Sequence, residues 1–439
     1  MKMIFRHAIP LLLSACPGTG ANALYGAAPE NELSDQAINE RIQQHRTAEA
    51  TLTVMDADGK PLANAPIALR QTRHQFLFGC SMLKFDRCRT PEENEAYKTR
   101  FKELMNFATL GLYWGVYEPR EGQLDDARWH AVAQWCKDNG VRAKGHPLVW
   151  TGEPRWLLDK SPDEGEAALW RRVRREVSGF AGLVDTWDAI NEPCVGVSQA
   201  KERNAQTALR LYERDGAAAV IAKAFATARA ANPQATLILN DFNVTDKFAN
   251  LARNCLAASV TIDAIGLQSH MHTGYWGPQK TWDTCERFAP LGKPLHFTEV
   301  TIMSGRQTAK EGNKATFTSQ PGDEERQAAQ VAEFYRILFS HPSVEAITWW
   351  DFSDQGAWFG APAGLLRKDM SPKPAYEALH RLIKGEWWTG PLELKTDAQG
   401  RVKFRGFLGD YAVESTRGQG SFPLPKAGAA AVSVPLGRK

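Results

Sequence analysis

Two glutamates that each lie in a short apolar run carry the clearest chemical signal in this sequence. Glu192 follows the run from Val184 to Ile190, directly after Asn191 and before a proline, and Glu299 lies within LHFTEVTI. A carboxylate at the end of a buried strand is costly unless a site uses it. Two such groups about 5–5.5 Å apart are the machinery of a retaining glycosidase. We therefore interpret them as a catalytic pair, with two structural ion-pair partners as the alternative.

The neighbours of the two glutamates predict a division of roles. One carboxyl must be protonated to donate to the leaving oxygen, and the other must be ionised to attack the anomeric carbon. Asn191 can hydrogen-bond a sugar 2-hydroxyl beside Glu192, so we assign Glu192 as the acid/base and Glu299 as the nucleophile. His270 is the candidate donor that keeps Glu299 ionised.

These residues need a scaffold, and the middle of the chain alternates strand-like and helical segments. The strand-like runs are 76–79, 106–114, 141–150, 185–192, 236–243, 262–270, 295–302 and 344–352. Helical patterns separate them, such as 163–180, where Leu169, Val173 and Val177 share a stripe. Eight strands alternating with helices predict the α/β class and a (β/α)8 TIM barrel, whose chemistry sits at the C-terminal ends of the strands. Polar or aromatic groups close six of the eight runs, as this interpretation requires.

Over residues 76–384 the chain resembles glycoside hydrolase family 10, the family of endo-β-1,4-xylanases. WDAINEP is similar to the acid/base motif W-D-V-x-N-E, HFTEVTI to the nucleophile strand T-E-L-D-I, and GHPLVW to G-H-T-L-V-W. The resemblance implies retaining, double-displacement hydrolysis of internal β-1,4 linkages in xylan or a related hemicellulose, with no cofactor. It also implies that the sugars lie against His146, Trp150, Gln268, His270, Trp350 and Trp358.

Two departures from the family pattern lie near the predicted sugar on the non-reducing side. Before Trp114 the family usually shows E-N-x-x-K-W, whereas this chain has Thr109, Leu110 and Tyr113. The expected Trp-His-Ser-Gln is replaced by the segment 150–153, Trp-Thr-Gly-Glu. Losing the Lys and Asn contacts removes charge-assisted hydrogen bonds of about 1.5–3 kcal/mol each. A retaining β-glycosidase for a different or heavily substituted glycan is therefore the alternative function.

Two further alternatives belong to other classes. His270 and His272 form an H-x-H pattern, which metal-dependent hydrolases on barrels use. Such sites need further His and Asp ligands and would leave Glu192 without a role, so no metal is predicted. A non-catalytic carbohydrate-binding barrel would keep the fold, but it has no need of both carboxylates, Asn191 and His270.

The two ends of the chain differ in character from the predicted catalytic barrel of residues 71–388. Segments 47–70 and 390–416 both show alternating strands around Gly-containing turns. Together they resemble small β-sandwich modules related to the carboxypeptidase regulatory domain, which predicts one small accessory β domain built from both ends. Two separate appendages are the alternative. Residues 417–439, rich in Gly, Ala and Pro, are predicted to be a tail.

The first residues are typical of an export signal. Lys2 and Arg6 precede a short apolar run, and Leu13-Ser14-Ala15-Cys16 resembles a bacterial lipoprotein signal in which the cysteine is lipidated. Ordinary cleavage near residues 21–23 is the alternative. We expect a signal peptide over 1–23 and an exported protein that is periplasmic, anchored by lipid to an outer membrane, or extracellular.

The charge and the aromatic content of the chain indicate which classes of molecule it binds. With 53 basic and 50 acidic residues the net charge is only +3, so no nucleic-acid partner is expected. The 14 tryptophans suit stacking on sugar rings as well as core packing. We expect a monomer that binds a polysaccharide or oligosaccharide. Export permits disulfides. The scattered spacing of the cysteines predicts no pairing, and Cys80 and Cys88, expected to share one loop, are the favoured pair if one forms.

Overall fold

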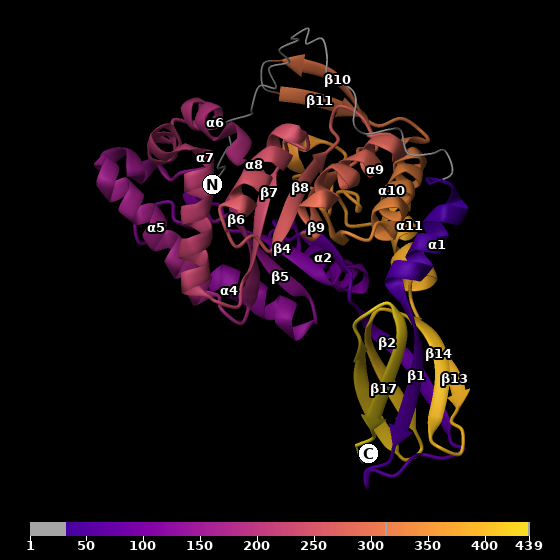
Figure 1. Cartoon of the computed structure of the whole chain (residues 1–439). Helices are drawn as coiled ribbons and strands as arrows, with labels where there is room; N and C mark the ends of the chain where they lie inside the picture. Colours follow the sequence, from indigo (N-terminus) through magenta and orange to yellow (C-terminus); the bar gives the residue numbers. More distant parts are fainter. Residues whose placement is uncertain (1–31, 312–313, 438–439) are drawn as a thin grey trace.

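The computed structural model describes residues 32–311 and 314–437. In that part, the chain forms a large barrel with a smaller β domain attached to it (Figure 1). The predicted signal segment 1–23, with Cys16, lies outside the described residues. No helix within them combines the length and the apolar character that a membrane crossing would need.

Eight parallel strands close the barrel in the order β12-β3-β4-β5-β6-β7-β8-β9. Their bounds are β3 (Leu77–Ser81), β4 (Phe107–Gly111), β5 (Arg142–His146), β6 (Val184–Asn191), β7 (Thr236–Asp241), β8 (Ala264–His270), β9 (Leu295–Thr301) and β12 (Val344–Trp349). Each overlaps one of the eight predicted runs, so the predicted (β/α)8 barrel is confirmed. Three predicted runs (106–114, 141–150 and 344–352) extend past their strands by three residues or more, because the chain leaves the sheet there for the loops and the short helix α3 that follow.

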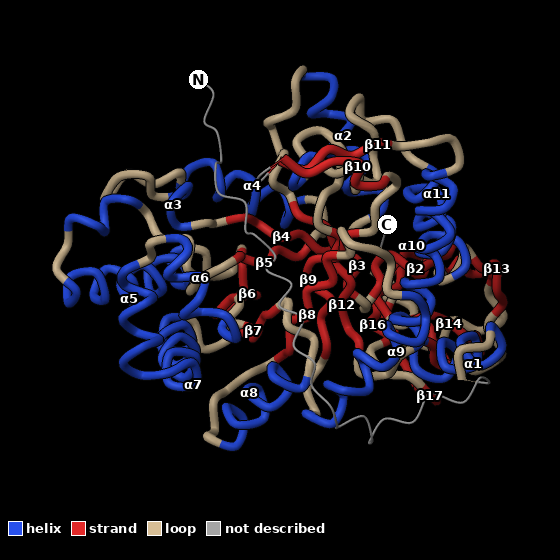
Figure 2. Tube along the Cα trace, turned by 90° about the horizontal axis from the view of Figure 1, so that it is seen from above, coloured by secondary structure: helices blue, strands red, loops and turns tan. Residues whose placement is uncertain are grey.

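Helices surround the barrel strands (Figure 2). They are α2 (Pro91–Leu104), α3 (Trp114–Tyr117), α4 (Asp126–Asp138), α5 (Pro162–Gly179), α6 (Gly196–Arg203), α7 (Gln206–Ala231), α8 (Asp246–Ala257), α9 (Gly277–Phe288), α10 (Asp323–Ser340) and α11 (Pro374–Arg381), preceded by α1 (Asp35–Arg46). Short helical turns are η1 (Arg155–Asp159), η2 (Pro193–Val195), η3 (Ala289–Leu291), η4 (Trp358–Gly360) and η5 (Leu382–Glu386), and a hairpin, β10 (Arg306–Glu311) with β11 (Lys314–Thr318), follows β9. Local chemistry sets the start of α5, where Ser161 and Glu164 form a capping box and Pro162 occupies the first turn. The predicted stripe of Leu169, Val173 and Val177 is buried on this helix.

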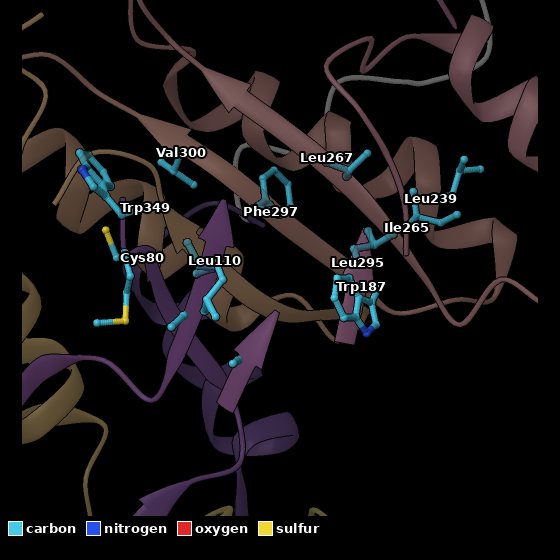
Figure 3. Packing of buried hydrophobic residues seen from close by; sticks show 14 of the residues in the cluster. Cys80, Leu110, Trp187, Leu239, Ile265, Leu267, Leu295, Phe297, Val300 and Trp349 are labelled. Carbon is cyan, nitrogen blue, oxygen red and sulfur yellow. The ribbon is translucent and has the colours of Figure 1, made fainter. Parts of the chain in front are cut away.

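The strands of the barrel share one hydrophobic core, part of which Figure 3 shows. Trp187 and Trp349 are its largest fully buried side chains. Gly145 makes room for the first of them, since a Cβ at this position would lie 2.1 Å from the Trp187 ring. The predicted Cys80–Cys88 disulfide is wrong, because both cysteines are free. Cys80 belongs to β3 and is fully buried in this core, whereas Cys88 lies half-buried in the loop that follows.

The β domain joins the two ends of the described chain. One sheet has the order β14 (Arg401–Phe407), β1 (Thr47–Met55), β17 (Gly428–Pro435), and the other has β13 (Leu392–Lys395), β2 (Pro66–His74), β15 (Gly409–Ser415), β16 (Gly418–Leu424). They enclose a core of their own, separate from that of the barrel. The prediction of a tail over 417–439 is wrong, because β16 and β17 belong to these sheets. The small residues of β17 pack alongside β1, to which they are paired in parallel.

Arg46 is the last residue of α1, directly before the first strand of the β domain, and it binds the barrel. Its guanidinium donates to the backbone oxygens of Phe339, His341 and Val344 over 2.5–2.7 Å. It also lies over the Phe76 ring, 4.9 Å from the centroid. Burial lowers the pKa of Arg46 to about 10, so the group stays charged at neutral pH.

Replacing Arg46 by alanine should destabilise the protein, because three carbonyl oxygens lose a charged donor together. We expect Arg46→Ala to lower the free energy of unfolding by about 3 kcal/mol or more in urea titrations. The matched control is Arg405→Ala on β14, an exposed arginine whose loss should change stability by less than about 0.5 kcal/mol. Equal stability of the two variants would contradict the role given to Arg46.

Candidate active site

The C-terminal end of the barrel gathers the residues that the sequence singled out. They come from β5, β6, β8, β9 and the loops after β5, β6 and β12, and they are His146, Trp150, Asn191, Glu192, Gln268, His270, Glu299, Trp350 and Trp358. Each contacts at least one other member of the set, as described below. Trp358 is the most exposed, at 37%. One polar and aromatic site therefore occupies the mouth of the barrel.

Glu299 of β9 is buried and held by donors on both oxygens. Its Oε1 accepts a hydrogen bond from Asn240 Nδ2 at 2.9 Å, and its Oε2 lies 3.0 Å from His270 Nε2. His146 Nδ1 lies 4.0 Å from Oε1. Burial opposes ionisation, but the charge of His146 and the hydrogen bond from His270 outweigh it and lower the pKa of Glu299. An ionised carboxylate at this point can act as a nucleophile.

Glu192 follows β6 in a left-handed backbone conformation, with φ 57° and ψ 43°. A residue with a long side chain held there stores about 1–3 kcal/mol of strain, which structures retain mainly at functional sites. Its Oε2 accepts from Trp150 Nε1 at 3.0 Å and from Gln199 Nε2 at 2.5 Å. Its Oε1 accepts from Gln268 Nε2 at 3.1 Å. Three side-chain N–H groups thus orient this carboxyl.

Side-chain amides connect the two glutamates. Asn191 Oδ1 accepts from Asn240 Nδ2 at 2.7 Å and from Gln268 Nε2 at 3.1 Å. The same two amides bind Glu299 and Glu192 respectively, so one hydrogen-bond network contains both carboxylates. Because the Asn191 oxygen accepts both bonds, its Nδ2 group is left to donate elsewhere, as the predicted contact with a sugar hydroxyl requires.

A buried cluster of charges that sequence reasoning missed supports His146. Asp188 Oδ2 accepts from Lys144 Nζ and from His146 Nδ1, each at 2.7 Å, and the side chains are 0–2% exposed. Burial opposes ionisation of Asp188, but the charge of Lys144 and the contact with His146 lower its pKa. The available signal was a lysine and an aspartate inside apolar strand-like runs, where an unpaired charge is not tolerated.

Two tryptophans of the loop after β12 pack against the site histidines. The Trp350 ring lies 5.5 Å from His146 and 5.7 Å from His270, and the Trp358 ring lies 4.6 Å from His270. Asp351 accepts the backbone N–H of Trp358 at 3.1 Å, and burial raises the pKa of Asp351 to about 7. This carboxyl therefore shapes the loop that carries Trp358.

His270 and His272, the two residues of the H-x-H pattern, have other partners than a shared metal ion. Both ring nitrogens of His270 have partners, since Nδ1 lies 2.9 Å from Thr301 Oγ1 and Nε2 contacts Glu299. The His272 ring packs 5.1 Å from Trp358 instead. Across residues 32–311 and 314–437, no group of three or more His, Cys, Asp or Glu side chains is arranged to hold a metal ion.

The segments that depart from the family pattern have identifiable contacts. Thr109 and Leu110 are fully buried, whereas the half-buried Tyr113 ring packs 5.3 Å from His146 and 5.7 Å from Trp150. Glu153 turns to the start of α7, where it accepts the backbone N–H of Thr207 and that of Ala208. Burial raises the pKa of Glu153 to about 7. An aromatic ring and a helix-capping carboxyl thus replace polar groups that would face sugar.

Comparison with known proteins assigns the barrel to one family. A family model described as "Glycosyl hydrolase family 10" matches residues 70–382. The beta-1,4-xylanase of Dictyoglomus thermophilum is 30% identical over 284 residues, which are 60% of this chain and 78% of that protein. The anti-sigma-I factor RsgI6 of Acetivibrio thermocellus is 26% identical over 396 residues, or 87% of this chain. This chain spans about half the length of RsgI6 and of the endo-1,4-beta-xylanase/feruloyl esterase of Xylanibacter ruminicola, 46% of each.

Solved structures agree with the fold. Xylanase 10B from Thermotoga petrophila RKU-1, in complex with xylobiose, superimposes with a TM-score of 0.59 at 22% identity. The match covers 71% of this chain and 95% of the xylanase. The barrel architecture is therefore shared.

The contact between His270 and Glu299 predicts a measurable shift in titration. In His270→Phe the ionised form of Glu299 loses a hydrogen bond and a nearby charge, so its pKa should rise, by about one unit or more. Carbon-13 NMR of labelled glutamate carboxyls can follow this titration, with Glu299→Gln identifying the resonance. Thr301→Val is the matched control, because it leaves the His270–Glu299 contact in place and should cause a smaller shift. An unmoved titration in His270→Phe would contradict the assignment.

Proposed function

This chain belongs to glycosyl hydrolase family 10, and we propose that it is a retaining glycoside hydrolase that cleaves internal β-1,4 linkages of xylan or a related hemicellulose. The observation that carries the proposal is the pair of glutamates at the ends of β6 and β9, joined in one network but with different partners. Glu299 has a lowered pKa beside two histidines, while three N–H donors orient Glu192.

The proposed reaction is a double displacement. Glu299 attacks the anomeric carbon and forms a glycosyl ester, while Glu192 gives its proton to the departing glycosidic oxygen. Glu192, now ionised, takes a proton from water, which attacks the anomeric carbon, releases Glu299 and yields a product of retained configuration. Asn191 donates to the sugar 2-hydroxyl, and Trp350 and Trp358 supply ring faces against the bound sugars. No cofactor takes part in these steps.

The substrate class rests on the relatives and on the retained motifs. Proteins named as β-1,4-xylanases match the barrel, and a solved relative was crystallised with xylobiose. His146, Trp150, Gln268 and His270 stand where the family resemblance places sugar contacts. These points favour xylan over unrelated glycans.

The second candidate is a retaining β-glycosidase that acts on a different or heavily substituted glycan. Tyr113 favours it, because its ring fills the space beside His146 and Trp150 where the family has a lysine. A ring can stack on a sugar but replaces a charged donor. The reaction would be the same, and only the accepted sugar would differ.

From the pattern of Lys2, Arg6 and the Leu-Ser-Ala-Cys segment we also propose that the protein is exported, with either a lipid anchor at Cys16 or ordinary cleavage near residues 21–23. We propose in addition that it acts as a monomer. The mass of the mature N-terminus distinguishes lipidation from cleavage near residues 21–23, and sedimentation measures the oligomeric state. For the β domain we propose a relationship to carboxypeptidase-regulatory modules and a supporting role. In line with that role, none of the large apolar side chains exposed in the described residues lies in this domain.

Substitution of each glutamate tests the proposed mechanism. Glu299→Ala and Glu192→Ala should each lower kcat on xylan by at least about 10³-fold. Azide should restore turnover in Glu299→Ala with a product of inverted configuration, because the anion enters where the nucleophile was. Glu393→Gln, an exposed residue of β13, is the control. Full activity of either alanine variant would refute the assignment.

A panel of substrates separates the two candidate functions. Initial rates on xylan, glucuronoxylan, arabinoxylan, mixed-linkage glucan and aryl β-xylosides should favour a xylan, and preference for glucan would support the second candidate. If the Tyr113 ring sets the preference, Tyr113→Phe should keep the native order of substrates. Tyr113→Lys should raise kcat/KM on unsubstituted xylan by about tenfold, the value of one charge-assisted hydrogen bond.

A further inference from the structure

We propose that Gln199 of α6 is a positioning residue that decides which oxygen of Glu192 carries the catalytic proton. The inference rests on the proposed function and adds a residue outside the family motifs in this chain. Gln199 is 4% exposed and donates through Nε2 to Glu192 Oε2 at 2.5 Å. It never needs to touch the sugar, because it acts through Glu192.

The amide of Gln199 is oriented from both sides. A carboxylate oxygen can only accept, so the Gln199 nitrogen must face Glu192. On the other side, the Thr151 hydroxyl donates to Gln199 Oε1 at 3.3 Å, and Thr151 is itself buried. A short chain of hydrogen bonds therefore runs from the loop after β5, through α6, to the acid/base.

The number of donors differs between the two oxygens of Glu192. Oε2 accepts two N–H bonds, from Trp150 and Gln199, which use both of its in-plane lone pairs. Oε1 accepts one, from Gln268, which also binds Asn191. A proton on Oε2 would displace a donor, whereas a proton on Oε1 displaces none. The proton therefore belongs on Oε1, beside the Asn191 amide that is proposed to meet the sugar.

Helix α6 supports both donors to Oε2. Arg203 lies one turn after Gln199 on the same face of the helix, and its guanidinium sits 4.3 Å from the centroid of the Trp150 ring. On the same ring, Gly152 leaves room that a Cβ would fill, at 2.7 Å from Trp150. One short helix thus orients Glu192 directly through Gln199 and indirectly through Trp150.

This arrangement accounts for a departure in the sequence. The family shows Trp-His-Ser-Gln after the third barrel strand, which is β5 here. This chain has Trp150-Thr151-Gly152-Glu153 in that place. Glu153 has a carboxylate in place of an amide, and it accepts two backbone N–H groups of α7, so it cannot donate to Glu192. Gln199 instead provides an amide donor to Glu192 from α6.

Leaving groups of different quality test the inference. Gln199→Met keeps the length of the side chain and removes the N–H donor, so the proton can move to the unproductive Oε2. On aryl glycosides of the best-cleaved sugar, kcat/KM for an unactivated phenyl leaving group should fall about tenfold or more. With 2,4-dinitrophenolate, which departs without a proton, the fall should stay below about threefold. Equal losses on both substrates, or no loss on the phenyl glycoside, would overturn the proposal.

Two further variants keep the result interpretable. Thr151→Val removes the group that orients Gln199, so it should reproduce the same substrate dependence more weakly, even if Gln199→Met does not fold. Lys201→Gln, on the exposed side of α6, should leave both rates unchanged. Release of dinitrophenolate by the native protein, and its loss in Glu299→Ala, tests the proposed function separately. The ratio between the two leaving groups tests Gln199 alone.

Discussion

The site depends on one constraint: each charge buried inside the barrel needs a partner of opposite charge. Asp188 and Lys144 have no exposed surface, and a charge in that position is stable only with a partner at hydrogen-bonding distance. Their pairing leaves Asp188 able to hold His146 as well, and His146 in turn lies next to Glu299. The lowered pKa of Glu299 therefore depends on the Lys144–Asp188 ion pair of the neighbouring strands β5 and β6, which acts on Glu299 through His146. Removal of Asp188 would take away the hydrogen-bonding partner of the buried Lys144, and removal of Lys144 would leave Asp188 with His146 alone.

Much of this arrangement could be predicted from the sequence, because it follows from periodicity and from strand ends. The alternation of apolar runs and amphipathic helices specified the barrel, and the barrel placed Glu192, Glu299 and His270 at one mouth. Gln199 could not be found in this way, since the stretch around it is polar and typical of a surface helix. Its burial arises only when the fold brings α6 to Glu192 and to Thr151 of the loop after β5, which is a tertiary effect.

The two other failures of prediction have similar causes. Residues 428–435 are mostly small and carry no clear strand pattern of their own, and their strand is specified by the edge of β1 that they pair with. Cys80 and Cys88 are close in sequence, but β3 carries Cys80 into the core while Cys88 stays in the loop. In both cases the tertiary fold, rather than the local sequence, determines the structure: β1 for the strand at 428–435, and the barrel sheet for the position of Cys80.

The proposed reaction chemistry and the proposed sugar recognition share residues, because Trp150, Gln268 and His270 each contact a glutamate and are also predicted sugar contacts. The groups that contact the two carboxylates lie on strands, on α6 and, for Trp150, in the loop after β5, and their mutual hydrogen bonds make each dependent on the others. The residues that differ from the family lie in loops, where Tyr113 packs against Trp150 and Thr151 donates a hydrogen bond to Gln199. Changes in these loops can therefore reach Glu192 through Trp150 and Gln199.

The parallel pairing of β1 with β17 has a consequence for biosynthesis. Ala48 pairs with Gly428, which is 428 − 48 = 380 positions later in the chain. A ribosome therefore delivers every barrel strand, ending with β12 at Trp349, before it delivers either neighbour of β1. The nascent barrel has all its partners early, whereas β1 must wait with both hydrogen-bonding edges open. The sheet of β1 is complete only when β14 and then β17 have been made.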